Sequence, residues 1–181
     1  MLISKQQKFM LDVLGRLGCV RKRQLTALLE RAFFPEGKTA PPGFVDTLFR
    51  QLRYGNIDLR AEEDVIFLPG KRPNARLLEA IDVMLELSDA RPLDYWTDEK
   101  EPVLLRFSVD GKRISLFAVL HADGFMGADI RAPPVFGPTV RLVILLSGES
   151  IPPALPVPNT QFYALRQKDG THRFFRGKTP E

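Results

Sequence analysis

Four segments near the start of the chain carry hydrophobic side chains at the three- and four-residue spacing of an amphipathic helix. The first covers residues 4–17, with Ser4 as its expected N-cap, and the second covers residues 21–33. A third helix is expected over about 43–54 and a fourth over about 74–88. The hydrophobic face of the third helix consists of Phe44, Val45, Leu48, Phe49 and Leu52.

The pattern changes between the third and fourth of these helices. Residues 57–60 and 65–68 are predicted to be short strands, joined by an acidic turn at 61–64. Residue 19 and its neighbours are expected to form only a turn between the first two helices. Three helices followed by a hairpin is the order of a winged helix, a helix-turn-helix with a two-stranded wing. We therefore expect residues 1–90 to form a winged-helix domain.

The rest of the chain, residues 91–181, is predicted to be a small mixed β-sheet domain. The polar stretch 89–101 is expected to be a linker, with Tyr95 and Trp96 packing back on one of the domains. The expected strands cover residues 103–109, 114–120, 141–146, 161–167 and 171–176. Asp110-Gly111 is a strong hairpin signal between the first two of them. Residues 121–139 are rich in glycine and proline, and residues 150–158 are too proline-rich for a long helix. With helices expected in the first part and strands in the second, the fold class is α+β.

Charge is distributed unevenly along the 181 residues. Residues 1–60 hold 11 lysines and arginines against 5 acidic residues, so they carry +6, whereas the remainder carries −2. A basic segment favours a polyanionic partner, although a basic solvated surface is an equal alternative on charge alone. The single cysteine, Cys19, permits no intrachain disulfide and fits a reducing compartment. With no signal sequence and no apolar run of about 20 residues, we expect a cytoplasmic protein without membrane contact.

The third predicted helix is the one that a helix-turn-helix places in the major groove of double-stranded DNA. Its outward residues are expected to read bases, and these are Arg50, Arg53, Thr47 and Gln51. Arginine suits bidentate contact with guanine. The basic residues that begin the preceding helix are expected to contact phosphates, and these are Arg21, Lys22 and Arg23. The oligomeric state is open, although paired half-sites on DNA would favour a dimer.

The tip of the predicted wing is acidic, unlike the basic tip expected of a wing that binds DNA. Glu62, Glu63 and Asp64 would repel a phosphate backbone, where arginine or lysine would attract it. The alternative is therefore a protein–protein adaptor, which uses the same helix or the second domain for its partner. DNA binding remains the preferred interpretation, since the basic residues gather on the helix-turn-helix.

Catalytic chemistry has little support in the sequence. There is no phosphate-binding glycine loop and no serine elbow, and neither His121 nor His172 has a nucleophile nearby in the sequence. A metal-dependent nuclease is a remote alternative, with Asp110 as its first acid. The next strand, 114–119, contains no carboxylate and no lysine to complete such a site, and Asp123 and Asp129 lie in a loop without a partner lysine. We therefore expect no enzymatic activity, no metal and no cofactor.

The order of these motifs resembles a known family. The stretches that carry the resemblance are QKFMLDVLGRLGCVRKRQLTALL, FVDTLFRQLRYGNIDL and DVIFLPG, followed by ARLLEAIDVMLEL and EPVLLRFSVDGKRISLFAVL. They are similar to the replication-relaxation family of winged-helix bacterial and plasmid proteins, and to related uncharacterised bacterial families. The resemblance implies an accessory or regulatory role in plasmid or mobile-element replication or transcription. It also implies that residues 91–181 form a degenerate restriction-endonuclease-like domain, which serves as a scaffold or a contact surface for a protein partner.

Overall fold

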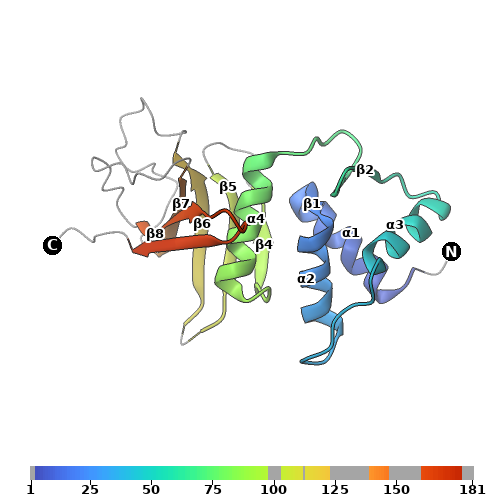
Figure 1. Ribbon diagram of the computed structural model, residues 1–181, viewed down its shortest axis with the longest axis horizontal. Coiled ribbons are helices and arrows are strands. Elements are labelled where there is room, and N and C mark those ends of the chain that lie inside the picture. Colours follow the sequence, from blue (N-terminus) through green and yellow to red (C-terminus); the bar gives the residue numbers. More distant parts are fainter. Residues whose placement is uncertain (1–2, 98–102, 112, 123–138, 147–159, 177–181) are drawn as a thin grey trace.

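In the computed structural model, which describes residues 3–97, 103–111, 113–122, 139–146 and 160–176, the described helices lie in the first half of the chain and the strands lie in both halves. Within these residues the protein is mixed α+β, with four helices, a small three-stranded sheet and a larger six-stranded sheet. Figure 1 shows helices α1 to α3 at one end of the molecule, the large sheet at the other, and helix α4 between them. None of the described helices combines the length and the apolar character needed to cross a bilayer.

The first half of the chain pairs three helices with the small sheet. Its elements are α1 (Lys5–Leu17), β1 (Cys19–Arg21), α2 (Lys22–Phe33), α3 (Phe44–Tyr54), β2 (Arg60–Glu62) and β3 (Val65–Phe67). The strand order is β1-β3-β2, and both pairings are antiparallel. Ser4 caps α1 as expected, and Gly43 enters α3 with a left-handed φ of 72° that favours glycine. The three helices therefore lie within a residue or two of their predicted bounds.

Two expectations about this half were wrong. The residues around Cys19 are a strand rather than a turn, because β1 pairs with β3 and buries Val20 against the core. The first strand of the hairpin is β2, three residues later than residues 57–60, because Leu59 turns into the core before the pairing with β3 begins. Cys19 is buried as expected, and burial raises the pKa of its thiol above the ordinary value.

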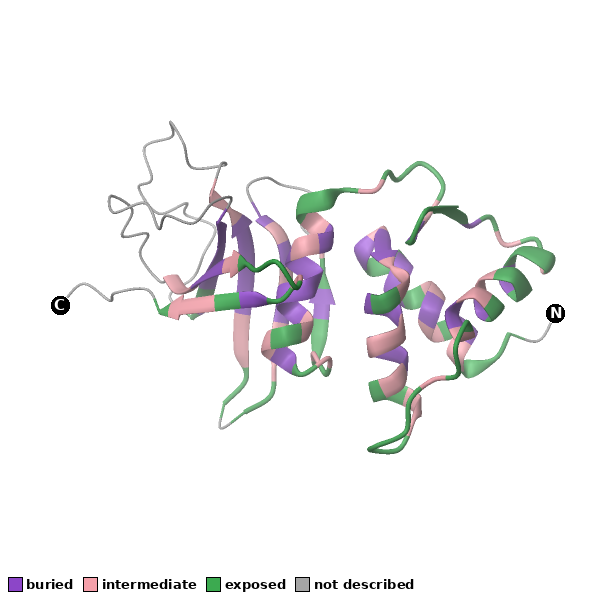
Figure 2. Cartoon of the chain, in the orientation of Figure 1, coloured by how far each residue is buried: buried purple, intermediate pink, exposed green. Residues whose placement is uncertain are grey.

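Helix α4 (Ala75–Ser88) packs both against the N-terminal helices and against the large sheet. Its first turn is capped by the Asn74 side chain, which accepts from the backbone N–H groups of Arg76 and Leu77. Ala80, Ile81, Val83 and Met84 are all fully buried, and a single hydrophobic cluster extends from α1 through α4 to the large sheet. Figure 2 shows buried residues on both sides of α4. A helix that is buried nearly all round packs against neighbours on both sides rather than lying on a surface.

The large sheet contains its strands in sequence order. These are β4 (Asp94–Trp96), β5 (Val103–Val109), β6 (Ser115–His121), β7 (Val140–Leu146), β8 (Thr160–Arg166) and β9 (His172–Arg176). Strands β6, β7 and β8 are parallel neighbours, whereas the other pairings are antiparallel. The predicted strands of the second half are confirmed within one residue. Of the two stretches 121–139 and 150–158, all but residues 121, 122 and 139 lie outside the described residues.

The stretch expected to be a linker contains an edge strand. In β4, Tyr95 pairs with Phe107 of β5, so this part of residues 89–101 belongs to the sheet. Tyr95 packs back on the core as expected, whereas Trp96 is 37% exposed. Arg16 of α1 forms an ion pair with Asp94, and its guanidinium lies 5.5 Å from the centre of the Tyr95 ring. These contacts join the edge of the large sheet to the end of α1.

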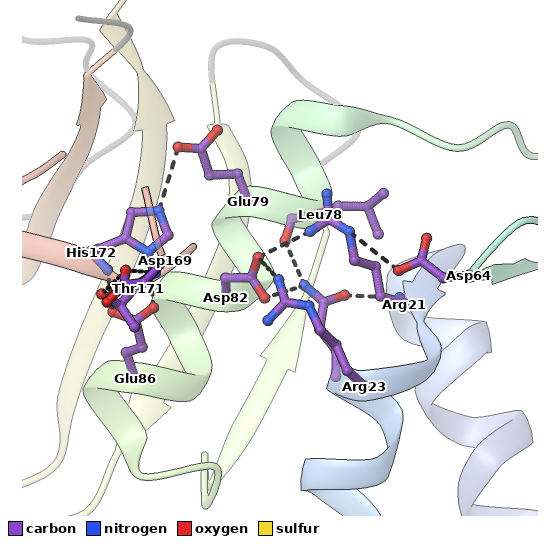
Figure 3. A network of polar contacts seen from close by, with 11 residues as sticks. Arg21, Arg23, Asp64, Leu78, Glu79, Asp82, Glu86, Asp169, Thr171 and His172 are labelled. Atoms are coloured by element: carbon purple, nitrogen blue, oxygen red, sulfur yellow. Dashed lines mark hydrogen bonds and ion pairs between the residues drawn. The ribbon is translucent and has the colours of Figure 1, made fainter. Parts of the chain in front are cut away.

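At the opposite edge of the sheet, a buried histidine joins strand β9 to helix α4. His172 has no exposed side-chain surface; its Nδ1 lies 2.9 Å from a Glu86 oxygen, and its Nε2 lies 3.4 Å from a Glu79 oxygen. Figure 3 shows the ring between the two carboxylates. Burial lowers the pKa of His172, but the hydrogen bonds and negative charges of Glu79 and Glu86 outweigh it, so the pKa is raised.

This arrangement predicts a loss of stability at alkaline pH. The raised pKa of His172 contributes stability that is complete below about pH 6.5, its ordinary value, and is lost as the pH rises through the folded-state pKa. The pKa of Glu79 is lowered, mainly by its hydrogen bond to His172, so its contribution is lost instead in acid. Urea unfolding of wild type and His172→Gln at about pH 6 and pH 8.5 measures the difference. Equal pH dependence of the two proteins would contradict the prediction.

Candidate nucleic-acid interface

Helix α3 turns one face to the core and the opposite face to solvent. Val45, Leu48 and Leu52 are at most 5% exposed and pack against the rest of the N-terminal half. Because an α-helix advances about 100° per residue, the polar residues between them point the other way. The exposed residues of α3 are Thr47, Arg50, Gln51, Arg53 and Tyr54. All four residues that the sequence predicted as base-reading therefore lie on one solvent-facing surface, which we call the α3 face.

Arg50 occupies the middle of the α3 face. It lies three residues after Thr47 and four before Tyr54, the spacing at which helical side chains are neighbours. Its Nε donates to the Asp46 carbonyl at 3.4 Å, and the side chain is exposed. The guanidinium of Arg53 lies 5.9 Å from the centre of the Phe49 ring. The two arginines thus present charged groups next to each other on the exposed helix.

Glutamine residues join the α3 face to the start of α1. The Gln7 Nε2 group donates to the Gln51 Oε1 atom at 2.9 Å. Gln7 is buried, with 4% exposure, and its own oxygen accepts from the Ser4 backbone N–H. Gln51 is consequently held by a buried partner, although it is itself exposed.

The basic residues that begin α2 bind acidic partners. Lys22 contacts Asp46 of α3 at 2.7 Å. Arg21 and Arg23 both bind the Asp82 carboxylate of α4, at 3.0 and 2.6 Å. In Figure 3 both guanidinium groups point toward α4 at this carboxylate. The predicted contacts of these three residues with phosphates remain predictions, and in this structure their charges are engaged within the protein.

Asp82 is the centre of this network. Its side chain is only 3% exposed, and its second oxygen accepts from Gln24 Nε2 at 2.7 Å. The same Gln24 group also donates to the Leu78 carbonyl, so a buried amide and a buried carboxylate satisfy each other. The network fixes the start of α2 against α4, and through α4 against the large sheet.

The hairpin tip keeps the acidic character expected from the sequence. Glu62, Glu63 and Asp64 are exposed. The Asp64 carbonyl accepts from the Lys22 backbone N–H at 2.7 Å, and its carboxylate lies 3.9 Å from Arg21. The tip is therefore anchored beside the start of α2, and its carboxylates oppose contact with phosphates.

Other residues considered from the sequence supply little chemistry. Asp110 is exposed and directly follows β5, and Asp123 and Asp129 lie outside the described residues. His121 ends strand β6 and is half-buried. Among the residues that the structure describes, no group of three or more histidine, cysteine, aspartate or glutamate side chains is placed to hold a metal ion.

One residue of the α3 face and one buried residue that contacts it were missed as site residues. Tyr54 is 87% exposed, the most exposed large hydrophobic residue described, and its helical position opposite the core is readable from the sequence. Gln7 is readable as part of a capping box with Ser4, three residues earlier. Its contact with Gln51 joins residues 44 positions apart, and no sequence pattern indicates that contact.

Comparison of the chain with protein-family models, with curated proteins and with solved structures found no match. The resemblance to the replication-relaxation family therefore remains a prediction from the sequence. The same holds for the restriction-endonuclease-like character of the second half. The assignment of a function rests on the geometry and the charge of the α3 face.

Proposed function

We propose that the first ninety residues form a winged helix that binds double-stranded DNA, with α3 in the major groove. The order α1-β1-α2-α3-β2-β3 and the three-stranded antiparallel sheet support this assignment. An α-helix fits the major groove of B-DNA, where base edges carry a distinct pattern for each base pair. The role is one of binding rather than catalysis, as in an accessory or regulatory protein.

The main support for the proposal is a difference between two sets of basic side chains: some form ion pairs with carboxylates of the protein, and others do not. Within the described part of residues 1–60, five basic side chains form ion pairs, and these are Arg16, Arg21, Lys22, Arg23 and Arg31. In the same part, neither Arg50 nor Arg53 pairs with a carboxylate, and both are exposed. Unpaired guanidinium groups on a rigid helix can bind phosphates or guanine without first breaking an internal ion pair.

The elements next to α3 indicate which other parts of the protein would contact DNA. Lys5 and Lys8 begin α1 and are exposed, and Arg60 begins the hairpin. These cations suit contacts with phosphates beside the groove. The acidic tip of the hairpin opposes insertion into the minor groove, so we expect the wing to contribute little to affinity. The second half then remains available to a protein partner.

A protein–protein adaptor is the second candidate. The exposure of Tyr54, at 87%, favours it, because tyrosine is enriched in protein interfaces. The acidic hairpin tip is also more compatible with a protein partner than with DNA. Both candidates use the α3 face, so the experiment below separates them by the chemistry of the ligand rather than by location.

Fluorescence anisotropy with a random-sequence duplex at several salt concentrations tests the proposal. Each neutralised phosphate makes the logarithm of the affinity fall by about 0.9 per logarithm of salt. With about four phosphates contacted, a fourfold increase in salt is expected to weaken binding on the order of 100-fold. No binding at low salt would contradict the DNA proposal and favour the adaptor.

A further inference from the structure

A chain of three residues connects the first turn of α1 to the α3 face. The Ser4 backbone N–H donates to Gln7 Oε1 at 2.8 Å, and Gln7 Nε2 donates to Gln51 Oε1 at 2.9 Å. The Gln7 N–H in turn donates to Ser4 Oγ at 3.2 Å, which completes the capping box. The middle residue of the chain is buried, whereas the last is exposed on the α3 face.

The direction of every bond in this chain is fixed by chemistry. A backbone N–H only donates, so it must face the oxygen of Gln7, and the Gln7 amino group must face Gln51. An amino group also only donates, so Gln51 must offer its oxygen. The reverse arrangement would place donors against donors at a buried residue, which costs about 1–3 kcal/mol for each group left unsatisfied. The Gln51 oxygen therefore turns toward α1, and its amino group turns outward.

We propose that Gln7 is a positioning residue that makes Gln51 a donor-only reader of base edges. This inference rests on the proposed binding of DNA through α3. A free glutamine recognises adenine with its oxygen and its amino group together. Held by Gln7, Gln51 uses its amino group alone, which matches the acceptors N7 and O6 of guanine, N7 of adenine and O4 of thymine. Cytosine presents an amino donor at this edge and is disfavoured.

The substitution Gln7→Glu reverses the exposed group while it keeps the shape of the side chain. A carboxylate still accepts from the Ser4 N–H with one oxygen, and its other oxygen accepts from the Gln51 amino group. Gln51 then turns its oxygen outward, where it accepts from the amino group of cytosine or adenine. Site selection from a random duplex library is expected to show a change of roughly five- to tenfold in relative preference at one base pair.

A matched control separates this effect from charge. Gln6→Glu makes the same chemical change on the preceding residue, whose side chain forms no described hydrogen bond with α3. Both variants add one negative charge and are expected to weaken binding to all duplexes alike, so the informative quantity is the ratio between sequences. Only Gln7→Glu is expected to alter the selected base pair. Gln7→Met cannot orient Gln51, so it is expected to relax the base preference at the same position. It replaces Gln7→Glu as the test variant if the buried glutamate prevents folding.

The outcomes separate the role of Gln7 from the proposed binding of DNA. If the wild type selects sites and both the Gln7→Glu and Gln7→Met variants select the same sequence, Gln7 does not position Gln51. The proposed binding of DNA is unaffected by that result. Binding without sequence preference in the wild type overturns it as well. Failure of the wild type to bind any duplex at low salt removes the proposed function, and the inference with it.

Discussion

Replacement of Asp82 with alanine is expected to lower the free energy of unfolding by about 3–5 kcal/mol. The carboxylate is 3% exposed and accepts from Arg21, Arg23 and Gln24. Its loss leaves Arg21, whose side chain is 16% exposed, as a largely buried cation without its closest anion. It also leaves the Gln24 amide with one acceptor fewer in the core. The cost of removing one member of a buried pair greatly exceeds the net contribution of the intact pair.

Asp12→Ala is the matched control for this prediction. Asp12 forms an ion pair with Arg16 at 2.9 Å, but both side chains are about half exposed, at 52% and 41%. Exposed pairs of this kind contribute less than about 1 kcal/mol. Denaturant unfolding of wild type and both variants compares the two sites directly. A loss below about 1 kcal/mol for Asp82→Ala would show that the network does not join α2 to α4 as described.

The double substitution Arg50→Ala/Arg53→Ala is expected to weaken duplex binding by at least about 30-fold. Each arginine contact with a base is worth about 1–3 kcal/mol, and these two are the unpaired cations of the α3 face. Neither side chain belongs to the core, so unfolding is expected to change by only a few tenths of a kcal/mol per residue. Anisotropy titrations at one low salt concentration measure the loss, with the unfolding midpoint as the check on folding.

Arg173→Ala/Arg176→Ala is the control for net charge. These two arginines of β9 are also exposed, and their replacement removes the same two positive charges from the opposite end of the protein. Figure 1 shows that β9 belongs to the sheet on the far side of α4 from α3. An equal loss of affinity in both double variants would attribute binding to overall charge and contradict a specific role of the α3 face.

The helices were predictable from the sequence because their period is strong. The hydrophobic positions of α3 repeat over three turns, and the same repeat that buries Leu48 and Leu52 places Arg50 on the outside. Strands β1 and β4 were missed because each has three residues, too few to show an alternation of two. Strand β3 is as short, but the acidic turn before it and Pro69-Gly70 after it indicated a hairpin strand. Their character as strands comes from their partners, β3 and β5, which lie elsewhere in the sequence.

The partners of the basic residues were not predictable for the same reason. Arg21 and Arg23 looked available for phosphates because Asp82 lies 61 and 59 positions further along the chain. The hydrogen bond that orients Gln51 likewise comes from a residue of α1. A sequence pattern indicates which side chains face away from the core of their own helix. It does not indicate which other element meets them there.

The most direct test of DNA binding through α3 is nuclear magnetic resonance with the ¹⁵N-labelled protein and a short duplex at low salt. We expect the amide shifts of Phe44–Tyr54, with those of the first turn of α1, to change most on addition of DNA. The resonances of the large sheet are expected to change little. Shifts that concentrate on β9 or on the acidic hairpin tip, with α3 unaffected, would contradict DNA binding through α3.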